Sequence, residues 1–271
     1  RPVSVVKFGF AGGGAVSELM TWRRLRRDGV RPDLLVVEAL PWSLNDVMPV
    51  SEMHPDRVPT DRLRWLDLPL LRRYHLGRPH LRRDVALAEI DPLYAHRVGI
   101  VHDIAPVLLP CPAWGRPTLV ERLAPTPCPD DPPPEMKAEW RSRVLRLTPQ
   151  NMATMGLGGR GCEAMRELLR SGREAGVPTA LLVVPESPTF RSWYSPAVSR
   201  GVETWLGQVS CEEGAPLADG RDWMGDEDFM DYSHLLPHSA TRFTARLGRE
   251  YLLPWLRRTA LGAVARSEPA P

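Results

Sequence analysis

Short apolar runs alternate with amphipathic stretches along much of the chain. Val3 to Phe10 predicts a buried strand, which ends at the three glycines of Gly12–Gly14. A helical pattern follows from Val16 to Leu25, and Leu34–Val37 is a second continuous apolar run, typical of a central parallel strand. Strand, glycine turn, helix and strand in this order indicate a βαβ unit.

The same rhythm returns in the second half of the chain. Ala180–Val184 predicts another buried strand and Pro216–Asp219 a short last one, while Cys162–Ala175, Val198–Val209 and Thr241–Leu256 have helical patterns. This alternation predicts an α/β fold, a three-layer α/β/α sandwich with a parallel, flavodoxin-like sheet. Binding sites in such sheets form where the strands end at their carboxyl side.

Residues from about 46 to 150 break the alternation. Asp61–Tyr74 and Leu81–Leu109 have helical patterns punctuated by prolines, and the Pro/Asp-rich stretch Pro125–Pro134 predicts an exposed loop. We interpret this region as a helical insertion or cap within a single domain that spans residues 1–271.

Composition narrows the class of protein. The net charge of +2 gives no sign of nucleic-acid binding, and no apolar run has the roughly 18 residues that a membrane span needs. The four cysteines have no CxxC spacing, which argues against zinc; a Cys111–Cys128 disulfide and free thiols both stay open. Because the chain starts at Arg1 without a methionine, we expect it to continue upstream, where a signal or anchor for an extracytoplasmic location would lie.

The tetrapeptide Asp231–His234 is the strongest chemical signal. An aspartate and a histidine three residues apart can meet when the chain between them turns. The carboxylate can then hold one imidazole nitrogen and leave the other able to take a proton from a nucleophile. An accidental surface pair is the alternative.

The surroundings of this pair resemble the last sequence block of the SGNH/GDSL hydrolases. Asp219-Gly220-Arg221-Asp222-Trp223 precedes it, and Leu235, Pro237 and an amphipathic helix follow. In that family the DxxH pair supplies the acid and the base of a serine triad, which would make Asp231 and His234 catalytic here.

Phe8–Gly13 resembles the family's second block, in which a strand ends at a glycine whose backbone N–H helps to build the oxyanion hole. Gly12 matches that glycine. A tight strand-to-helix turn is the alternative role of Gly12–Gly14. Where the family places an asparagine as second donor, this chain has Ala39–Trp42. Asn45, a few residues later, is the nearest candidate, and capping of the next turn is its alternative role.

The family's nucleophile block has no counterpart in this chain. Its Gly-Asp-Ser or Gly-x-Ser turn should precede Phe8, but Ser4 lies inside the apolar run without a glycine turn. Either the serine lies upstream of Arg1 or this member lacks it. The loop after Val184 carries Glu186, Trp193 and Tyr194; the two aromatic residues are candidates for a substrate mouth, and an ordinary loop is the alternative.

The resemblance implies a serine-dependent acyl-ester hydrolase or O-acyltransferase, with carbohydrate esters as a candidate substrate and no metal or organic cofactor. Some relatives of this type act in the O-acetylation of exported polysaccharides beside a membrane-bound acyltransferase. A catalytically inactive SGNH-like protein that binds a polysaccharide or such a partner is the second hypothesis. A flavodoxin-like nucleotide binder that uses Gly12–Gly14 at a helix N-terminus is the third.

Overall fold

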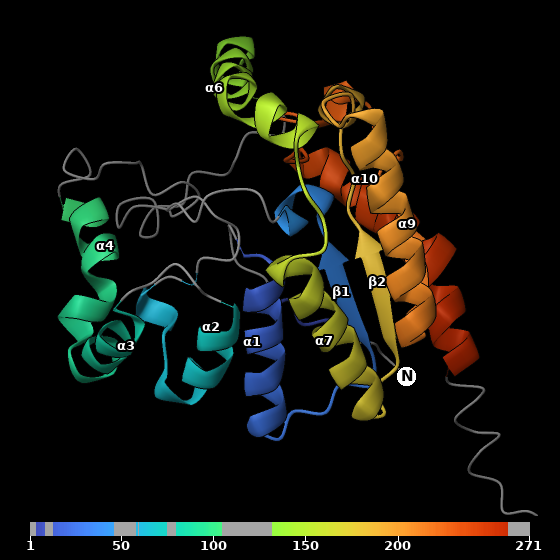
Figure 1. Ribbon diagram of the computed structural model, residues 1–271. Coiled ribbons are helices and arrows are strands. Elements are labelled where there is room, and N and C mark those ends of the chain that lie inside the picture. The colour runs from blue at the N-terminus through green and yellow to red at the C-terminus, as the bar shows by residue number, and fades with distance from the viewer. Residues whose placement is uncertain are drawn as a thin grey trace, which may run out of the picture. The chain divides into compact units, whose positions relative to one another are not determined.

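The computed structural model describes residues 4–8, 13–45, 58, 60–74, 80–104 and 132–259 (Figure 1). Two compact units divide the chain. The first comprises Arg1–Arg31, Ser43–Pro127 and Gly158–Leu168, and the second comprises Pro32–Trp42, Cys128–Leu157 and Leu169–Pro271.

A parallel sheet organises the second unit. Its strands are β1 (Leu35–Ala39), β2 (Thr179–Val183) and β3 (Leu217–Asp219), hydrogen-bonded in the order β1-β2-β3. All five residues of β2 are buried, as expected for a middle strand. The predictions of a mixed α/β fold and of parallel strands here are therefore confirmed.

The register brings the carboxyl ends of the three strands level. Ala39 lies opposite Val183, and Val183 lies opposite Asp219. The segments that leave the strands after these three residues therefore start at the same edge of the sheet, which is where parallel sheets carry their sites.

Helices of the second unit contact both faces of the sheet. On one face, Leu182 of β2 belongs to a buried cluster with Phe243 and Leu247 of α10 (Pro237–Leu247). On the other face, Thr179 lies against Gly172, in the part of α7 (Arg160–Glu174) that belongs to the second unit, so closely that a Cβ at the glycine would lie 2.3 Å from the threonine Oγ1.

The remaining elements of the second unit are α6 (Pro134–Ala153), α8 (Pro188–Arg191), α9 (Pro196–Glu213), the 3₁₀ turn Asp226–Asp228, and the π-helical turn Gly248–Leu252 that follows α10. α9 buries Val202, Trp205, Leu206 and Val209 and ends at Gly214, whose φ of 63° is left-handed. Glycine takes this conformation without strain, so it stops the helix before β3.

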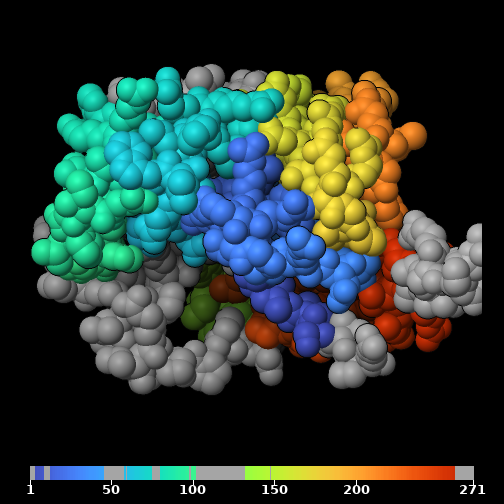
Figure 2. All heavy atoms as spheres, turned by 90° about the horizontal axis from the view of Figure 1, so that it is seen from below, coloured from blue at the N-terminus to red at the C-terminus, as the bar shows by residue number. Residues whose placement is uncertain are grey.

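The first unit is helical in its described part. It holds α1 (Ala15–Arg27), α2 (Leu68–Tyr74), α3 (Leu81–Ile90) and α4 (Pro92–Ile104), with 3₁₀ turns at Thr60–Arg62 and Trp65–Asp67. A further 3₁₀ turn, Pro41–Leu44, has its first two residues in the second unit and its last two in the first. α1 packs beside α2, as the blue and cyan atoms in Figure 2 show. Arg24 donates from Nε to the buried carboxylate of Asp67 at 2.9 Å, which ties α1 to the turn before α2.

Three predictions about secondary structure were wrong in part. Residues 4–8 form no strand, and Val5 is 88% exposed, because an apolar run becomes a strand only where a neighbour accepts its backbone hydrogen bonds. β1 lies at an edge of the described sheet rather than at its centre, with Val36 and Glu38 exposed. The helical pattern of Leu81–Leu109 breaks at Asp91, because Pro92 disfavours a helical conformation of the residue before it.

Several predicted features lie outside the described residues, namely Gly12, Cys111, Cys128 and most of the loop Pro125–Pro134. Of the described cysteines, Cys162 is buried and Cys211 is exposed. Among the helices that the structure describes, none is long and apolar enough to cross a membrane.

Candidate functional site

The tetrapeptide Asp231–His234 forms the tip of a tight hairpin. Phe229 and Leu235 pair as an antiparallel bridge, and the N–H of Met230 donates to the carbonyl of His234 at 2.9 Å. Within the tip, Tyr232 has a φ of 78°, a left-handed conformation that a tyrosine adopts only at a cost. This reversal turns the chain back so that the side chain of Asp231 faces His234.

Both oxygens of the Asp231 carboxylate lie within hydrogen-bond distance of one imidazole nitrogen of His234. Nδ1 of the ring lies 2.8 Å from Oδ2 and 3.0 Å from Oδ1. The backbone N–H of His234 also donates to Oδ1 at 2.9 Å, and the backbone N–H of Ser233 does so at 3.2 Å. Because an ionised carboxylate only accepts, Nδ1 carries the proton, and in the neutral ring Nε2 offers a lone pair.

Charge and burial reinforce this arrangement. Burial alone would raise the pKa of Asp231, but the hydrogen bonds and the charge of His234 outweigh it and the pKa is lowered. The hydrogen bond to Asp231 raises the pKa of His234. An ionised carboxylate beside a more basic imidazole is the electrostatic arrangement of a histidine general base.

The far side of the ring is accessible. The His234 side chain is 79% exposed, whereas that of Asp231 is 4% exposed. No residue in the described ranges makes a hydrogen bond to Nε2. Ser233 approaches the ring at Nδ1, with its Oγ 3.3 Å away, which is the nitrogen that Asp231 already holds. The nitrogen that would take a proton therefore faces outward.

Contacts from two other segments brace the hairpin tip at Tyr232. The ring of Trp193 meets the Tyr232 ring edge to face at 5.6 Å, and the Arg141 guanidinium of α6 lies 5.0 Å from the centre of the same ring. The N–H of Ser187, just after β2, donates to the Tyr232 carbonyl at 3.2 Å. Trp193, predicted to line a substrate mouth, therefore supports the turn that carries the Asp–His pair.

Tyr194 lies in a different environment from its neighbour. Its hydroxyl donates to Oε1 of Glu186 at 2.6 Å, and its ring packs edge to face on Phe190 at 6.2 Å. The two aromatic residues predicted to act together thus have separate roles. Arg141 had no sequence signal, because nothing local in α6 indicates a contact with a hairpin so far along the chain.

The structure tests neither of the two predicted oxyanion donors. Gly12 lies outside the described residues. Asn45 belongs to the first unit, where it is 5% exposed and directly follows the 3₁₀ turn Pro41–Leu44. Of the predicted catalytic, oxyanion and substrate residues, the structure brings together Asp231, His234 and, through Tyr232, Trp193. In the described part of the chain, no group of three or more His, Cys, Asp or Glu residues is placed to hold a metal ion.

No protein-family model matches the chain, and no curated protein and no solved structure matches it. The resemblance to the SGNH/GDSL hydrolases therefore stays a prediction that rests on the sequence around Asp231–His234 and on Phe8–Gly13.

Proposed function

We propose that this chain supplies the acid–base pair of a serine-dependent acyl-ester hydrolase or O-acyltransferase. His234 is the general base and Asp231 orients it. One observation carries the proposal. Nδ1 of His234 lies 2.8 Å and 3.0 Å from the two oxygens of the buried Asp231 carboxylate, and Nε2 on the other side of the ring is exposed. A surface pair formed by accident would not require a left-handed Tyr232 or a buried aspartate.

The pair would act on a serine that comes from outside residues 1–271. Nε2 of His234 takes the proton of the serine hydroxyl while Oγ attacks the acyl carbon. The ester C–O bond then breaks, and the imidazolium returns the proton to the leaving alcohol. In the second half, water or an acceptor hydroxyl gives its proton to Nε2 and attacks the acyl carbon; the bond from that carbon to the serine Oγ then breaks, and Oγ takes the proton back from Nε2.

The rest of the proposed fold and site follows the sequence resemblance. Helices that contact both faces of a parallel sheet support a three-layer α/β/α arrangement. Gly12 is the proposed backbone donor to the developing oxyanion, with Asn45 as the second donor. Carbohydrate esters are the proposed substrates, with no cofactor needed for the chemistry.

Replacement of His234 tests the proposal in the longest gene product that ends in this chain. Hydrolysis of p-nitrophenyl acetate should be measured for the unaltered protein, for His234→Ala and for His238→Ala. We expect His234→Ala to lose at least about 100-fold in kcat, the usual contribution of a general base. His238, an exposed residue four positions further on, is the matched control and should keep its activity. Equal rates for the two variants would overturn the assignment.

A ligand-binding protein on the same fold is the second candidate. It is favoured by Nε2 of His234, which meets no hydroxyl among the described residues. A fluorophosphonate serine probe, read by intact-mass spectrometry, separates the two functions. An adduct on the longer gene product supports the enzyme. If neither the longer product nor this chain gains an adduct, the result supports a binding protein for a polysaccharide or an acyltransferase partner.

A further inference from the structure

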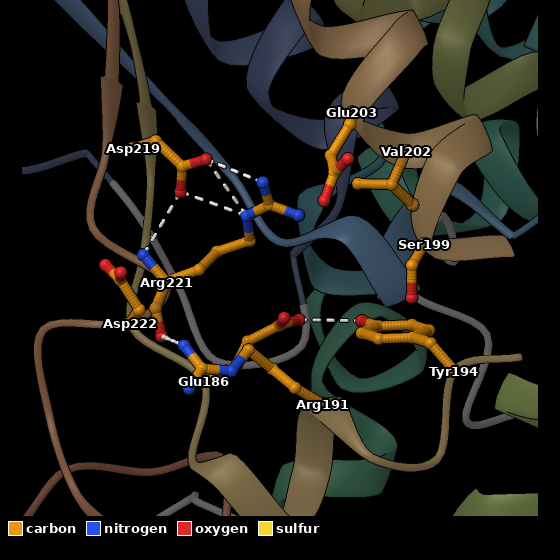
Figure 3. Close-up of a pocket in the computed structure, with 9 residues that line it drawn as sticks. All are labelled: Glu186, Arg191, Tyr194, Ser199, Val202, Glu203, Asp219, Arg221 and Asp222. Atoms are coloured by element: carbon orange, nitrogen blue, oxygen red, sulfur yellow. Dashed lines mark hydrogen bonds and ion pairs between the residues drawn. The ribbon is translucent and has the colours of Figure 1, made fainter. Parts of the chain in front are cut away.

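A cavity opens where β2 and β3 end, apart from the Asp231–His234 pair. It has a volume of about 390 Å³, and the residues that define it here are Glu186, Arg191, Tyr194, Glu203, Asp219 and Arg221 (Figure 3). Glu186 follows β2, Asp219 ends β3, and Glu203 comes from α9. This volume suits a small organic molecule.

Glu186 is the unusual group in this cavity. Its side chain is fully buried, and its Oε1 accepts the hydroxyl of Tyr194 at 2.6 Å. Oε2 is also buried but has no hydrogen-bond partner among the residues that the structure describes. An unpaired buried carboxylate oxygen is costly, because burial removes the water that would otherwise hydrogen-bond to it. A ligand that donates a hydrogen bond to Oε2 would remove that cost.

The positive groups nearby already have partners. Arg221 is held by Asp219 through two of its nitrogens, with Nη2 2.6 Å from Oδ2 and Nε 3.0 Å from Oδ1. Arg191 donates from Nη1 to the carbonyl of Arg221 at 2.6 Å. Neither guanidinium hydrogen-bonds to Oε2 of Glu186, so this oxygen is left to a ligand.

The balance of charge decides the sign of that ligand. Glu186, Asp219, Glu203 and Asp222 bring four carboxyl groups to the lining, against the two guanidinium groups of Arg191 and Arg221. Figure 3 shows the side chains of Glu203 and Arg221 pointing toward one another across the cavity. Such a lining repels anions and favours a cation.

We propose that this cavity binds a small organic cation through a primary ammonium group that donates to Oε2 of Glu186. An ammonium group has three N–H donors, so it can reach the buried oxygen and still hydrogen-bond to other lining groups, among them the Ser199 hydroxyl. The ring of Tyr194 and the side chain of Val202 give the carbon skeleton an apolar wall. A metal ion fits less well, because the described residues hold no cluster of three metal-binding side chains.

Binding should depend on pH in a defined direction. Burial raises the pKa of Glu186 to about 7, although the Tyr194 hydroxyl and the two arginines act to lower it. A bound ammonium favours the ionised carboxylate, so binding expels the proton that Glu186 carries below this pKa. Affinity for a primary alkylamine such as putrescine should therefore rise between pH 6 and pH 8, because the amine stays charged throughout this range.

Isothermal titration calorimetry on the 271-residue chain tests the proposal with two matched pairs of ligands. Putrescine is compared with 1,4-butanediol. Glucosamine is compared with glucose, at a pH where the amine of glucosamine is charged. We expect at least one amine to bind and its neutral analogue not to. Glu186→Gln should weaken amine binding at least about tenfold, because it removes the charge from the acceptor. Glu227→Gln, an exposed carboxylate outside the cavity, is the control.

The outcomes that overturn the proposal are equally defined. The proposal is wrong if amines and their neutral analogues bind equally well, or if Glu186→Gln binds amines as tightly as the unaltered chain. It is also wrong if neither amine binds at millimolar concentration. Circular dichroism shows whether Glu186→Gln has folded; if it has not, Glu203→Gln serves as the second variant and should weaken binding by removing a carboxylate from the cavity. Because the test does not involve His234, its result is independent of the esterase assay.

Discussion

The ring of Trp193 meets the ring of Tyr232 at an angle of 79°, with the ring centres 5.6 Å apart. This contact joins the loop after β2 to the hairpin tip that carries Asp231 and His234. Among the described residues, Tyr232 is also the one residue other than glycine that has a positive φ. The aromatic contact therefore lies at the strained position of the turn. The surrounding contacts must hold that backbone in place, because an isolated tyrosine disfavours it.

Two substitutions of Tyr232 separate the backbone from the ring. Tyr232→Phe keeps the ring against Trp193 and should change the free energy of unfolding by less than about 0.5 kcal/mol. Tyr232→Val loses the ring and places a β-branched residue at a φ of 78°, so it should destabilise by about 1–3 kcal/mol. Urea unfolding measures both. If the valine variant were as stable as the phenylalanine variant, neither the strain nor the ring contact would matter.

Removing the charge of Asp231 should change the titration of His234. The hydrogen bond to Asp231 raises the pKa of His234, so Asp231→Asn should move its NMR titration midpoint downward. A raised histidine pKa means that the pair adds stability below the ordinary histidine pKa and loses it as the pH rises through the raised one. The variant should therefore lose more stability at pH 5 than at pH 9. Asp222→Asn, with no contact to His234, is the control and should leave the titration of His234 unchanged. An unchanged midpoint in Asp231→Asn would contradict the pairing of Asp231 with His234.

Local patterns were enough to predict much of the second unit. β2 and β3 were predicted because short, buried apolar runs bounded by turn residues have few alternatives. Asp231 and His234 were predicted as a pair because they are three residues apart, and the turn that joins them is local.

Contacts between distant segments could not be predicted in this way. The φ of Tyr232 has no sequence signal, since tyrosine is not a residue that indicates a left-handed turn. Val5 has the pattern of a buried strand but is exposed, because its burial depends on a partner that the pattern does not specify. The unpaired oxygen of Glu186 is likewise visible only once Tyr194, Arg191 and Arg221 are in place.

The contact between Gly172 and Thr179 predicts a steric test of how α7 lies on the sheet. Gly172→Ala would place a Cβ 2.3 Å from the threonine Oγ1, and we expect a loss of about 1–3 kcal/mol in unfolding free energy. Thr179→Ala removes that oxygen, so the double variant should recover most of the loss. Gly207→Ala is the control in α9: no atom of the described residues lies within 4 Å of the Cβ it would add, and it should stabilise by up to about 1 kcal/mol. Additive effects of the first two changes would contradict the contact.

Glu186 should make the stability of the second unit depend on pH in an unusual direction. Its pKa is about 7 in the folded chain against an ordinary value of 4.5, so between these values the unfolded chain ionises while the folded chain keeps its proton. The free energy of unfolding is therefore not reduced by this group below pH 4.5, and it decreases by roughly 3 kcal/mol as the pH rises from 4.5 toward 7. Glu186→Gln cannot ionise and should lack this decrease. Urea unfolding at pH 4 and pH 8 measures the difference, with Glu227→Gln as the control. Parallel pH profiles for the Glu186→Gln variant and the unaltered chain would show that the carboxyl group is already ionised in its buried position.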